Sequence, residues 1–450
     1  MELISFILIY FFLTFSVIGY GFLFSKYLTK YNKYPNIGYV GLYGIFTLTL
    51  ISYLSNLFFK HDYIHNSVVI FVGFLLSIKY FFLSEDFFKK KENKYLFFFL
   101  ILSIFSILYF KSHDDFPYYH LSFINNLTTS KIEFGIGIFD LAFNHLSSLF
   151  FFHSLVKLPF TQDYFYFLGP ALILIFFNTI IFNEIFSFNK KIITFDFFFN
   201  LLIFSYINTF FYRLAEHGTD RSAIILIFLC ILLIFQILIQ KKLDKSKLEN
   251  FLILITFIVS LKSFYGIYGL LFFIIYFKFY NLRKIVIFFK DFKIINISIL
   301  FGLLMLFYNI AYTGCFIYPL SSTCAQSFYW GQDISTIEWA ANFYELWSKA
   351  GATPSYKVEN PDEFIKGFNW LKIWIDKYFF NKVSDNLLGL LFLILIFIIL
   401  FNPRKIKINF PKQYIAFIIL LFLFFCEWLY NHPSLRYGGY HLVALFFFIP

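Results

Sequence analysis

Long runs of uncharged, apolar residues dominate this chain, and they constrain its fold more than any other feature. Crossing the roughly 30 Å hydrocarbon core of a bilayer takes about 20 apolar residues in a helix. The runs from Leu3 to Phe24 and from Ala223 to Gln240 approach that length. Hydrophobic residues make up 60% of the 450 positions, against roughly 45–50% in soluble domains. The sequence therefore predicts an all-α polytopic membrane protein.

Basic residues lie in short clusters between the apolar runs. The formal net charge is +11, but the clusters are too dispersed to predict a nucleic-acid partner. The positive-inside rule places such clusters in the cytoplasm and so orients the helices. Most of the Lys and Arg residues fall in windows 26–33, 89–94, 190–191, 241–247, 283–293 and 404–412.

Keeping every basic cluster in the cytoplasm predicts about 13 transmembrane helices, within a range of 11 to 13. The run from Phe251 to Tyr280 is divided at Lys262, because a single span there would place one neighbouring basic cluster outside. The predicted spans are 3–24, 38–59, 64–84, 95–111, 165–187, 193–212, 222–240, 250–261, 264–279, 294–313, 385–402, 413–430 and 438 onward.

This topology places the acidic segments on the non-cytoplasmic face. Segments 111–164, 213–221, 314–384 and 431–437 emerge there together with the turn at 262, and with Asp62 they hold most of the 26 carboxylates. Outer loop 111–164 is aromatic but interrupted by His and Asn, which predicts amphipathic helices at the membrane interface. Five of the six Trp residues lie between 327 and 384, which is typical of a segment at headgroup depth.

Two cysteines lie in outer loop 314–384. Cys315 and Cys324 can form a disulfide if this loop faces an oxidising compartment, and two free cysteines are the alternative.

The most informative polar segment runs from Ser112 to His120 and contains Asp114 and Asp115. Pro117 suits the first turn of a helix, so the two acids precede its positive end and stay ionised. A carboxylate at this place can act as a general base toward an acceptor hydroxyl, which makes both acids candidate catalytic residues. A divalent metal site, or a solvated helix start, is the alternative. Three neighbours are candidate substrate-binding residues, namely His113, Tyr119 and His120.

A second polar segment runs from Arg213 to Arg221 between two apolar runs. Charged groups at such a depth are costly unless they are paired or bind a ligand. The planar fork of Arg221 can bind a phosphate through two hydrogen bonds. His217 and Asp220 are further candidates for substrate binding. An ordinary turn in which Asp220 neutralises Arg221 is the alternative.

Two more cations are expected on the same face. Lys262 lies between two apolar half-helices, where an ammonium must snorkel, pair or bind an anion. Arg436 follows the polar segment that begins at Asn431. Carboxylates and cations at a membrane-level opening suit a lipid-linked phosphate substrate. The chain has no phosphate-cradling Gly loop, zinc spacing or nucleophile elbow.

The order of a span, an Asp-Asp loop with aromatics and then interfacial helices resembles the GT-C superfamily of membrane glycosyltransferases. That resemblance implies a sugar donor on a polyprenyl phosphate or pyrophosphate, with Asp115 or Asp114 as the base. Arg221, Lys262 and Arg436 would hold the donor phosphate. Three predicted spans precede the comparable one, so residues 1–94 are expected to be additional N-terminal helices and residues 95–450 the GT-C-like domain.

The chain more closely resembles a family of uncharacterised polytopic bacterial membrane proteins thought to be GT-C-like. The shared pieces are Asp115 to Leu121, Phe143 to Ser148, Thr219-Asp220, Leu261-Lys262-Ser263, Gly314 with Tyr318-Pro319, and Arg436-Tyr437-Gly438.

The resemblance implies a glycosyltransferase of the bacterial cytoplasmic membrane whose active face is extracytoplasmic. Its partners would be a polyprenyl-phosphate sugar donor, membrane lipids, and a glycan, lipid or protein acceptor, with no cofactor beyond a possible divalent metal. A surface-polysaccharide polymerase or ligase is a second reading. A flippase of lipid-linked sugars is a third, although transporters usually show paired broken helices in two related halves, and here only residues 250–279 look broken.

Overall fold

The protein is helical throughout the part that the structure describes. The computed structural model describes residues 2–32, 35–83, 90–108, 115–187, 195–211, 218–280, 282–353, 357–401 and 412–449. These ranges contain no β-strand, and an isolated β-bridge joins Cys315 to Cys324. The prediction of an all-α chain is therefore confirmed.

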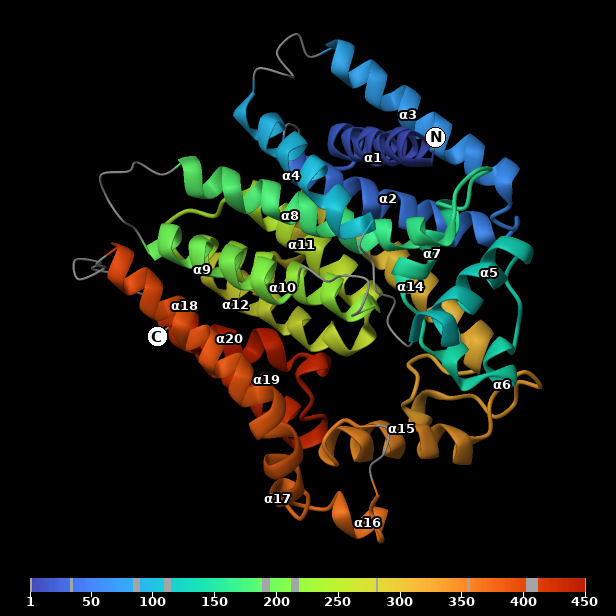
Figure 1. Cartoon of the computed structure of the whole chain (residues 1–450), viewed down its shortest axis with the longest axis vertical. Helices are drawn as coiled ribbons and strands as arrows, with labels where there is room; N and C mark the ends of the chain where they lie inside the picture. The colour runs from blue at the N-terminus through green and yellow to red at the C-terminus, as the bar shows by residue number, and fades with distance from the viewer. Residues whose placement is uncertain are drawn as a thin grey trace.

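Four long helices form the N-terminal part of the bundle: α1 (Glu2–Tyr27), α2 (Ile37–Asn56), α3 (Tyr63–Leu83) and α4 (Lys91–Leu108). Helix α1 packs against both α2 and α3 (Figure 1). The backbones of α1 and α3 touch, because a Cβ atom at Gly19 would lie 2.0 Å from the carbonyl oxygen of Gly73. Small residues permit such close helix packing in membranes.

The centre of the bundle is built on α10 (Gly218–Ile239), which packs against α8 (Leu168–Ser187) and α11 (Lys245–Leu261). Helix α10 is apolar on every side and almost wholly buried, as expected of a helix surrounded by others. Helix α9 (Phe195–Phe210) lies beside α8 and α10 (Figure 1).

The helical run after α10 is broken at Lys262, as the charge pattern predicted. Helix α11 ends at Leu261, and the chain continues as the 3-10 helix η6 (Ser263–Leu270) and α12 (Leu271–Phe279). Two further helices follow, α13 (Ile285–Asp291) and α14 (Ile294–Thr313).

The first predicted outer loop folds into short helices: η2 (Phe116–His120), α5 (Leu121–Thr129), α6 (Ile136–Phe139), η3 (Leu141–Asn144), α7 (Ser148–Leu155) and η4 (Asp163–Phe167). Helix α7 differs from the amphipathic interfacial helix that was expected there. All eight of its residues are buried, because it packs against α2, α5 and α8. Its His and Ser residues therefore lie inside the protein rather than at a membrane surface.

The second predicted outer loop contains η8 (Ser321–Thr323), α15 (Ile334–Lys349), α16 (Pro361–Phe364), α17 (Leu371–Trp374) and η9 (Ile375–Val383). A disulfide joins Cys315 to Cys324 with an S–S distance of 2.12 Å, which answers the question that the sequence left open. Trp370 and Trp374 are buried rather than placed at a surface. Their indole N–H groups donate to the carbonyl oxygens of Gly367 and Pro433, which satisfies them away from water.

The chain closes with α18 (Ser384–Phe401), α19 (Lys412–Asn431), η10 (Leu435–Tyr437) and α20 (Gly439–Phe448). Eight described helical segments are long and apolar enough to cross a membrane: 3–27, 37–56, 63–81, 165–187, 219–239, 294–313, 371–401 and 412–431. Shorter apolar helices cover 195–210, 263–279 and 439–448. The protein is thus a multi-pass membrane protein by composition, and a count of 13 spans stays a prediction.

Three of the basic windows meet at one end of the bundle. Asp291 pairs with Lys30 at 3.2 Å and with Lys245 at 3.0 Å. The carboxylate of Glu249 accepts hydrogen bonds from the backbone N–H groups of residues 30 to 32. The 22 residues of α10 rise about 33 Å from this end to the opposite one, close to the thickness of a bilayer core.

Candidate functional site

Four charged side chains meet at the end of α10 that lies away from the basic windows. Arg436 is central, because its Nε donates to Oδ2 of Asp220 at 2.5 Å and its Nη2 donates to Oδ2 of Asp115. The Nζ of Lys262 donates to the other oxygen of Asp220. We call these four residues the charged cluster. Each of them comes from a different segment of the chain.

Local structure explains how each member is placed. Asp115 directly precedes η2, whose first turn holds Pro117, as the sequence predicted. Asp220 lies in the first turn of α10, where the helix dipole favours a negative charge. Lys262 occupies the break between α11 and η6, and Arg436 lies in η10. Gly438 follows Arg436 with a φ of 103°, a conformation in which a residue with a Cβ is strained.

Burial makes the pairing within the charged cluster energetically important. The side chain of Asp220 is 4% exposed, whereas Asp115, Lys262 and Arg436 are 26%, 25% and 33% exposed. Burial lowers the pKa of Lys262, and the neighbouring Asp220 carboxylate opposes that change. For Arg436 burial also acts against the charge, but Asp220 and Asp115 outweigh it and raise the pKa well above its usual value. Two acids and two bases therefore form a balanced, ionised group.

Aromatic rings surround the cations. The Lys262 ammonium lies 5.0 Å from the ring centroid of Tyr437. Arg221 is buried and stacks between Phe211 and Tyr440, with ring centroids 4.4 and 4.2 Å from its guanidinium carbon. Such cation–π contacts stabilise a positive charge that has left water. Arg221 is thus held by aromatic neighbours, while Asp220 binds Lys262 and Arg436.

A neutral histidine lies beside the charged cluster. The Nε2 of His145 forms a hydrogen bond of 2.5 Å with the hydroxyl of Tyr344 in α15. Burial first, and then the charges of Lys262 and Arg436, lower the pKa of His145 to about 4. His145 is therefore uncharged near neutral pH. The sequence did not identify Tyr344 at all, because only the folded chain brings α15 against His145.

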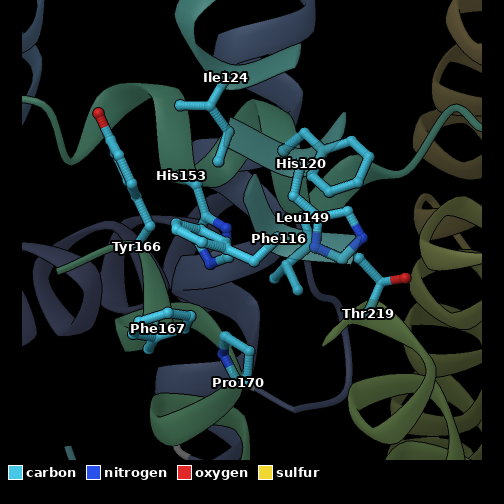
Figure 2. Close-up of a pocket in the computed structure, with 10 residues that line it drawn as sticks. Phe116, His120, Ile124, Leu149, His153, Tyr166, Phe167, Pro170 and Thr219 are labelled. Carbon is cyan, nitrogen blue, oxygen red and sulfur yellow. The ribbon is translucent and has the colours of Figure 1, made fainter. Parts of the chain in front are cut away.

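An apolar pocket is lined in part by sequence neighbours of the charged cluster, and Figure 2 shows its lining side chains. Phe116, which follows Asp115, and Thr219, which precedes Asp220, both line it. Its other lining residues are His120, Ile124, Leu149, Phe150, His153, Tyr166, Phe167 and Pro170. Most of these side chains are aromatic or aliphatic, so the pocket suits an apolar group placed next to the charges.

The structure brings together five of the predicted site residues. Asp115, Asp220, Lys262 and Arg436 form the charged cluster, and Tyr119 lies beside it, with the charges of Arg436, Asp115 and Asp220 all acting on its phenol. His120 lines the apolar pocket, and Arg221 lies in its aromatic stack. His113, Asp114 and His217 lie outside the described residues. Within the described ranges, no group of three or more His, Cys, Asp or Glu side chains is arranged to hold a metal ion.

Comparison with known proteins gives one match. A family model described as Domain of unknown function (DUF8201) matches residues 1–443, a range that includes the four N-terminal helices as well as every member of the charged cluster. No curated protein and no solved structure matches the chain.

Proposed function

The chain belongs to the family described as Domain of unknown function (DUF8201). From the geometry of the charged cluster we propose that it is a membrane glycosyltransferase with a polyprenyl-phosphate-linked sugar donor. The observation that carries this proposal is the guanidinium of Arg436, which lies between the carboxylates of Asp115 and Asp220 with Lys262 beside them. Cations for a phosphate and an acid for a hydroxyl are the two chemical needs of such a transfer.

The proposed reaction uses these residues in separate roles. The oxygen of an acceptor hydroxyl forms a bond to the anomeric carbon of the sugar, and the bond from that carbon to the phosphate oxygen breaks. Asp115 accepts the hydroxyl proton. Arg436 and Lys262 stabilise the negative charge that returns to the leaving phosphate, since charge-assisted hydrogen bonds to phosphate are strong. The more deeply buried Asp220 holds both cations in place.

Donor binding would also free the base. Arg436 is bound to Asp115 in the structure, so an incoming phosphate competes with that carboxylate for the same guanidinium. When the phosphate displaces it, the Asp115 carboxylate becomes available to a hydroxyl. Asp220, held from its other oxygen by Lys262, stays in position during this exchange.

The apolar pocket provides a place for the lipid next to the phosphate. Its lining includes Phe116 and Thr219, the sequence neighbours of Asp115 and Asp220. The carbon chain of a polyprenyl phosphate begins at the phosphate itself, so an apolar pocket within one residue of the cluster suits its first carbons.

We further propose that the charged cluster faces the extracytoplasmic side of a bacterial cytoplasmic membrane. Three of the basic windows meet at the other end of the bundle, and the Cys315–Cys324 disulfide follows α14 at the same end as the cluster.

Cysteine labelling tests this orientation. In a background with Cys230 and Cys426 replaced by Ala, a membrane-impermeant maleimide should label Asp362→Cys in intact cells. It should label Lys242→Cys only after the cells are opened, because residue 242 lies in the basic turn between α10 and α11. The reverse pattern would place the charged cluster in the cytoplasm and refute the assignment.

The glycosyltransferase proposal is tested with the purified full-length protein in lipid nanodiscs. A panel of polyprenyl-phosphate sugars with a labelled sugar is supplied with acceptor membranes, and both the released polyprenyl phosphate and the transferred sugar are measured. We expect transfer with at least one donor, unchanged in the control Asp376→Asn, whose carboxylate is exposed and lies outside the charged cluster. Movement of intact lipid-linked sugar across the bilayer without any transfer would favour a flippase and end the proposal.

A further inference from the structure

Three buried polar side chains of the outer segments have polar atoms whose hydrogen-bonding capacity is not filled in the described part of the chain. These atoms are Oδ1 and Nδ2 of Asn144, the hydroxyl of Tyr318 and Oε1 of Gln332. The three residues are only 3%, 7% and 8% exposed. None of them takes part in the transfer steps proposed above, and none carries a charge.

These side chains converge although they come from three segments. The Asn144 carboxamide occupies the space beside Gly137, where an added Cβ would lie 1.9 Å from Oδ1 of Asn144. Gln332 donates from Nε2 to the carbonyl oxygen of the same Gly137. Burial raises the pKa of the Tyr318 phenol, and hydrogen bonding to the Asn144 side chain opposes that rise. Asn144 therefore contacts both Gly137 and Tyr318, and Gln332 is bound to Gly137 from a third segment.

This group of side chains also adjoins the charged cluster. Asn144 precedes His145 in the chain, and the ring of Tyr318 lies 6.2 Å from the His145 ring. On its other side His145 is 6.1 Å from the ring of Tyr119 and is near enough to Lys262 and Arg436 for both to lower its pKa. His145 thus separates a charged region from an uncharged polar one.

Buried polar atoms in folded proteins nearly always have a protein, water or ligand partner. An amide offers two donors and an acceptor, a phenol offers one donor and an acceptor, and the free oxygen of Gln332 accepts. Sugar hydroxyls both donate and accept, so they can satisfy all of these atoms. A phosphate only accepts near neutral pH, and the uncharged groups here would not compensate its charge.

We propose that Asn144, Tyr318 and Gln332 form a binding subsite for an uncharged sugar ring. The role of this subsite rests on the glycosyltransferase proposal. In that reaction, the subsite would hold the sugar of the donor or of the acceptor beside the cations. Recognition is through hydroxyl groups, so removing one buried hydroxyl or carboxamide weakens binding without changing the net charge of the site.

Direct binding tests this inference without requiring turnover. Methyl glycosides of neutral hexoses, pentoses and N-acetylhexosamines are presented to the full-length protein in nanodiscs, and contact is measured by saturation-transfer NMR. We expect at least one glycoside to bind, and Tyr318→Phe and Asn144→Leu each to raise its Kd by about tenfold, as the loss of one or two hydrogen bonds would. Tyr414→Phe is the matched control, because its hydroxyl donates to the carbonyl of Ile449 in another part of the bundle.

The outcomes separate this subsite from the transfer reaction. Binding that Tyr318→Phe weakens, in a protein that transfers no sugar, would support the subsite and overturn the transferase. Transfer with an unchanged KM in Tyr318→Phe would leave the transferase and overturn the subsite. No contact with any glycoside would mean that the polar atoms bind only water, and it would overturn the subsite as well. Tyr318→Phe keeps the inference testable if Asn144→Leu does not fold.

Discussion

Asp115→Asn is expected to abolish sugar transfer, lowering kcat by at least about a thousandfold, while the protein stays folded and abundant in the membrane. An amide cannot accept the hydroxyl proton, and general-base catalysis contributes about a hundredfold to ten-thousandfold to enzymatic rates. The fold should tolerate the change because the Asp115 side chain is 26% exposed and Arg436 keeps its contact with Asp220. The measurement is single-turnover transfer with the donor identified in the panel.

Two comparisons make the Asp115 prediction specific. Asp140→Asn removes another acid of the same outer segment, one that accepts a hydrogen bond from the backbone N–H of Ala142, and it should leave the transfer rate within a few-fold of the original. Donor binding should survive in Asp115→Asn, since the phosphate no longer competes with a carboxylate for Arg436. Normal turnover in Asp115→Asn would exclude this residue as the base.

Asp220→Leu is expected to be the most destabilising single change in the charged cluster. It removes the shared partner of Lys262 and Arg436 and leaves two positive charges adjacent in a largely buried place. Removing one partner of a buried ion pair lowers the free energy of unfolding by about 3–5 kcal/mol. Both cations are partly exposed here, so we expect a loss of about 3 kcal/mol for Asp220→Leu. The measurement is the thermal unfolding temperature in one detergent, together with the yield of monodisperse protein.

A second substitution should recover much of the lost stability. The double variant Asp220→Leu/Lys262→Leu keeps the balanced pair of Arg436 with Asp115, so its unfolding temperature should return toward that of the original protein while transfer stays absent. Asp291→Asn is the control at the opposite end of the bundle, where its ion pairs to Lys30 and Lys245 are screened by solvent and contribute little to stability. A double variant as unstable as Asp220→Leu alone would show that charge balance is not what stabilises this site.

Much of the helical framework could be predicted from the sequence, because clusters of charged residues separate the apolar runs. The predicted spans 165–187 and 294–313 coincide with described helical segments, and the break at Lys262 followed from the positions of the basic clusters. The acidic and basic members of the charged cluster were also predicted, since an ionised group near the membrane must have a partner. Which partner each one takes was not predicted: Asp220 was paired with Arg221 in one reading, whereas it binds Lys262 and Arg436.

The buried parts of the outer segments were harder to predict. Helix α7 combines Phe, Ser and His in a pattern that suits an interface, yet its neighbours cover it on every side. Asn144 and Tyr318 lie in pieces shared with the uncharacterised family, but nothing in the sequence linked them to each other or to Gln332. Neutral polar residues are common in loops, and only the fold brings Asn144 and Gln332 together at Gly137. The local sequence pattern indicates which segments are hydrophobic or charged, but it does not indicate which segments pack against one another in the fold.

The distance along the chain between Arg436 and its two acids has a consequence for biosynthesis. Arg436 is 321 residues from Asp115 and 216 from Asp220 and comes after both of them in the chain. While the ribosome is still making the protein, Asp115, Asp220 and Lys262 are already inserted but the guanidinium that links them does not yet exist. A chain that stops before Arg436 therefore has no complete charged cluster.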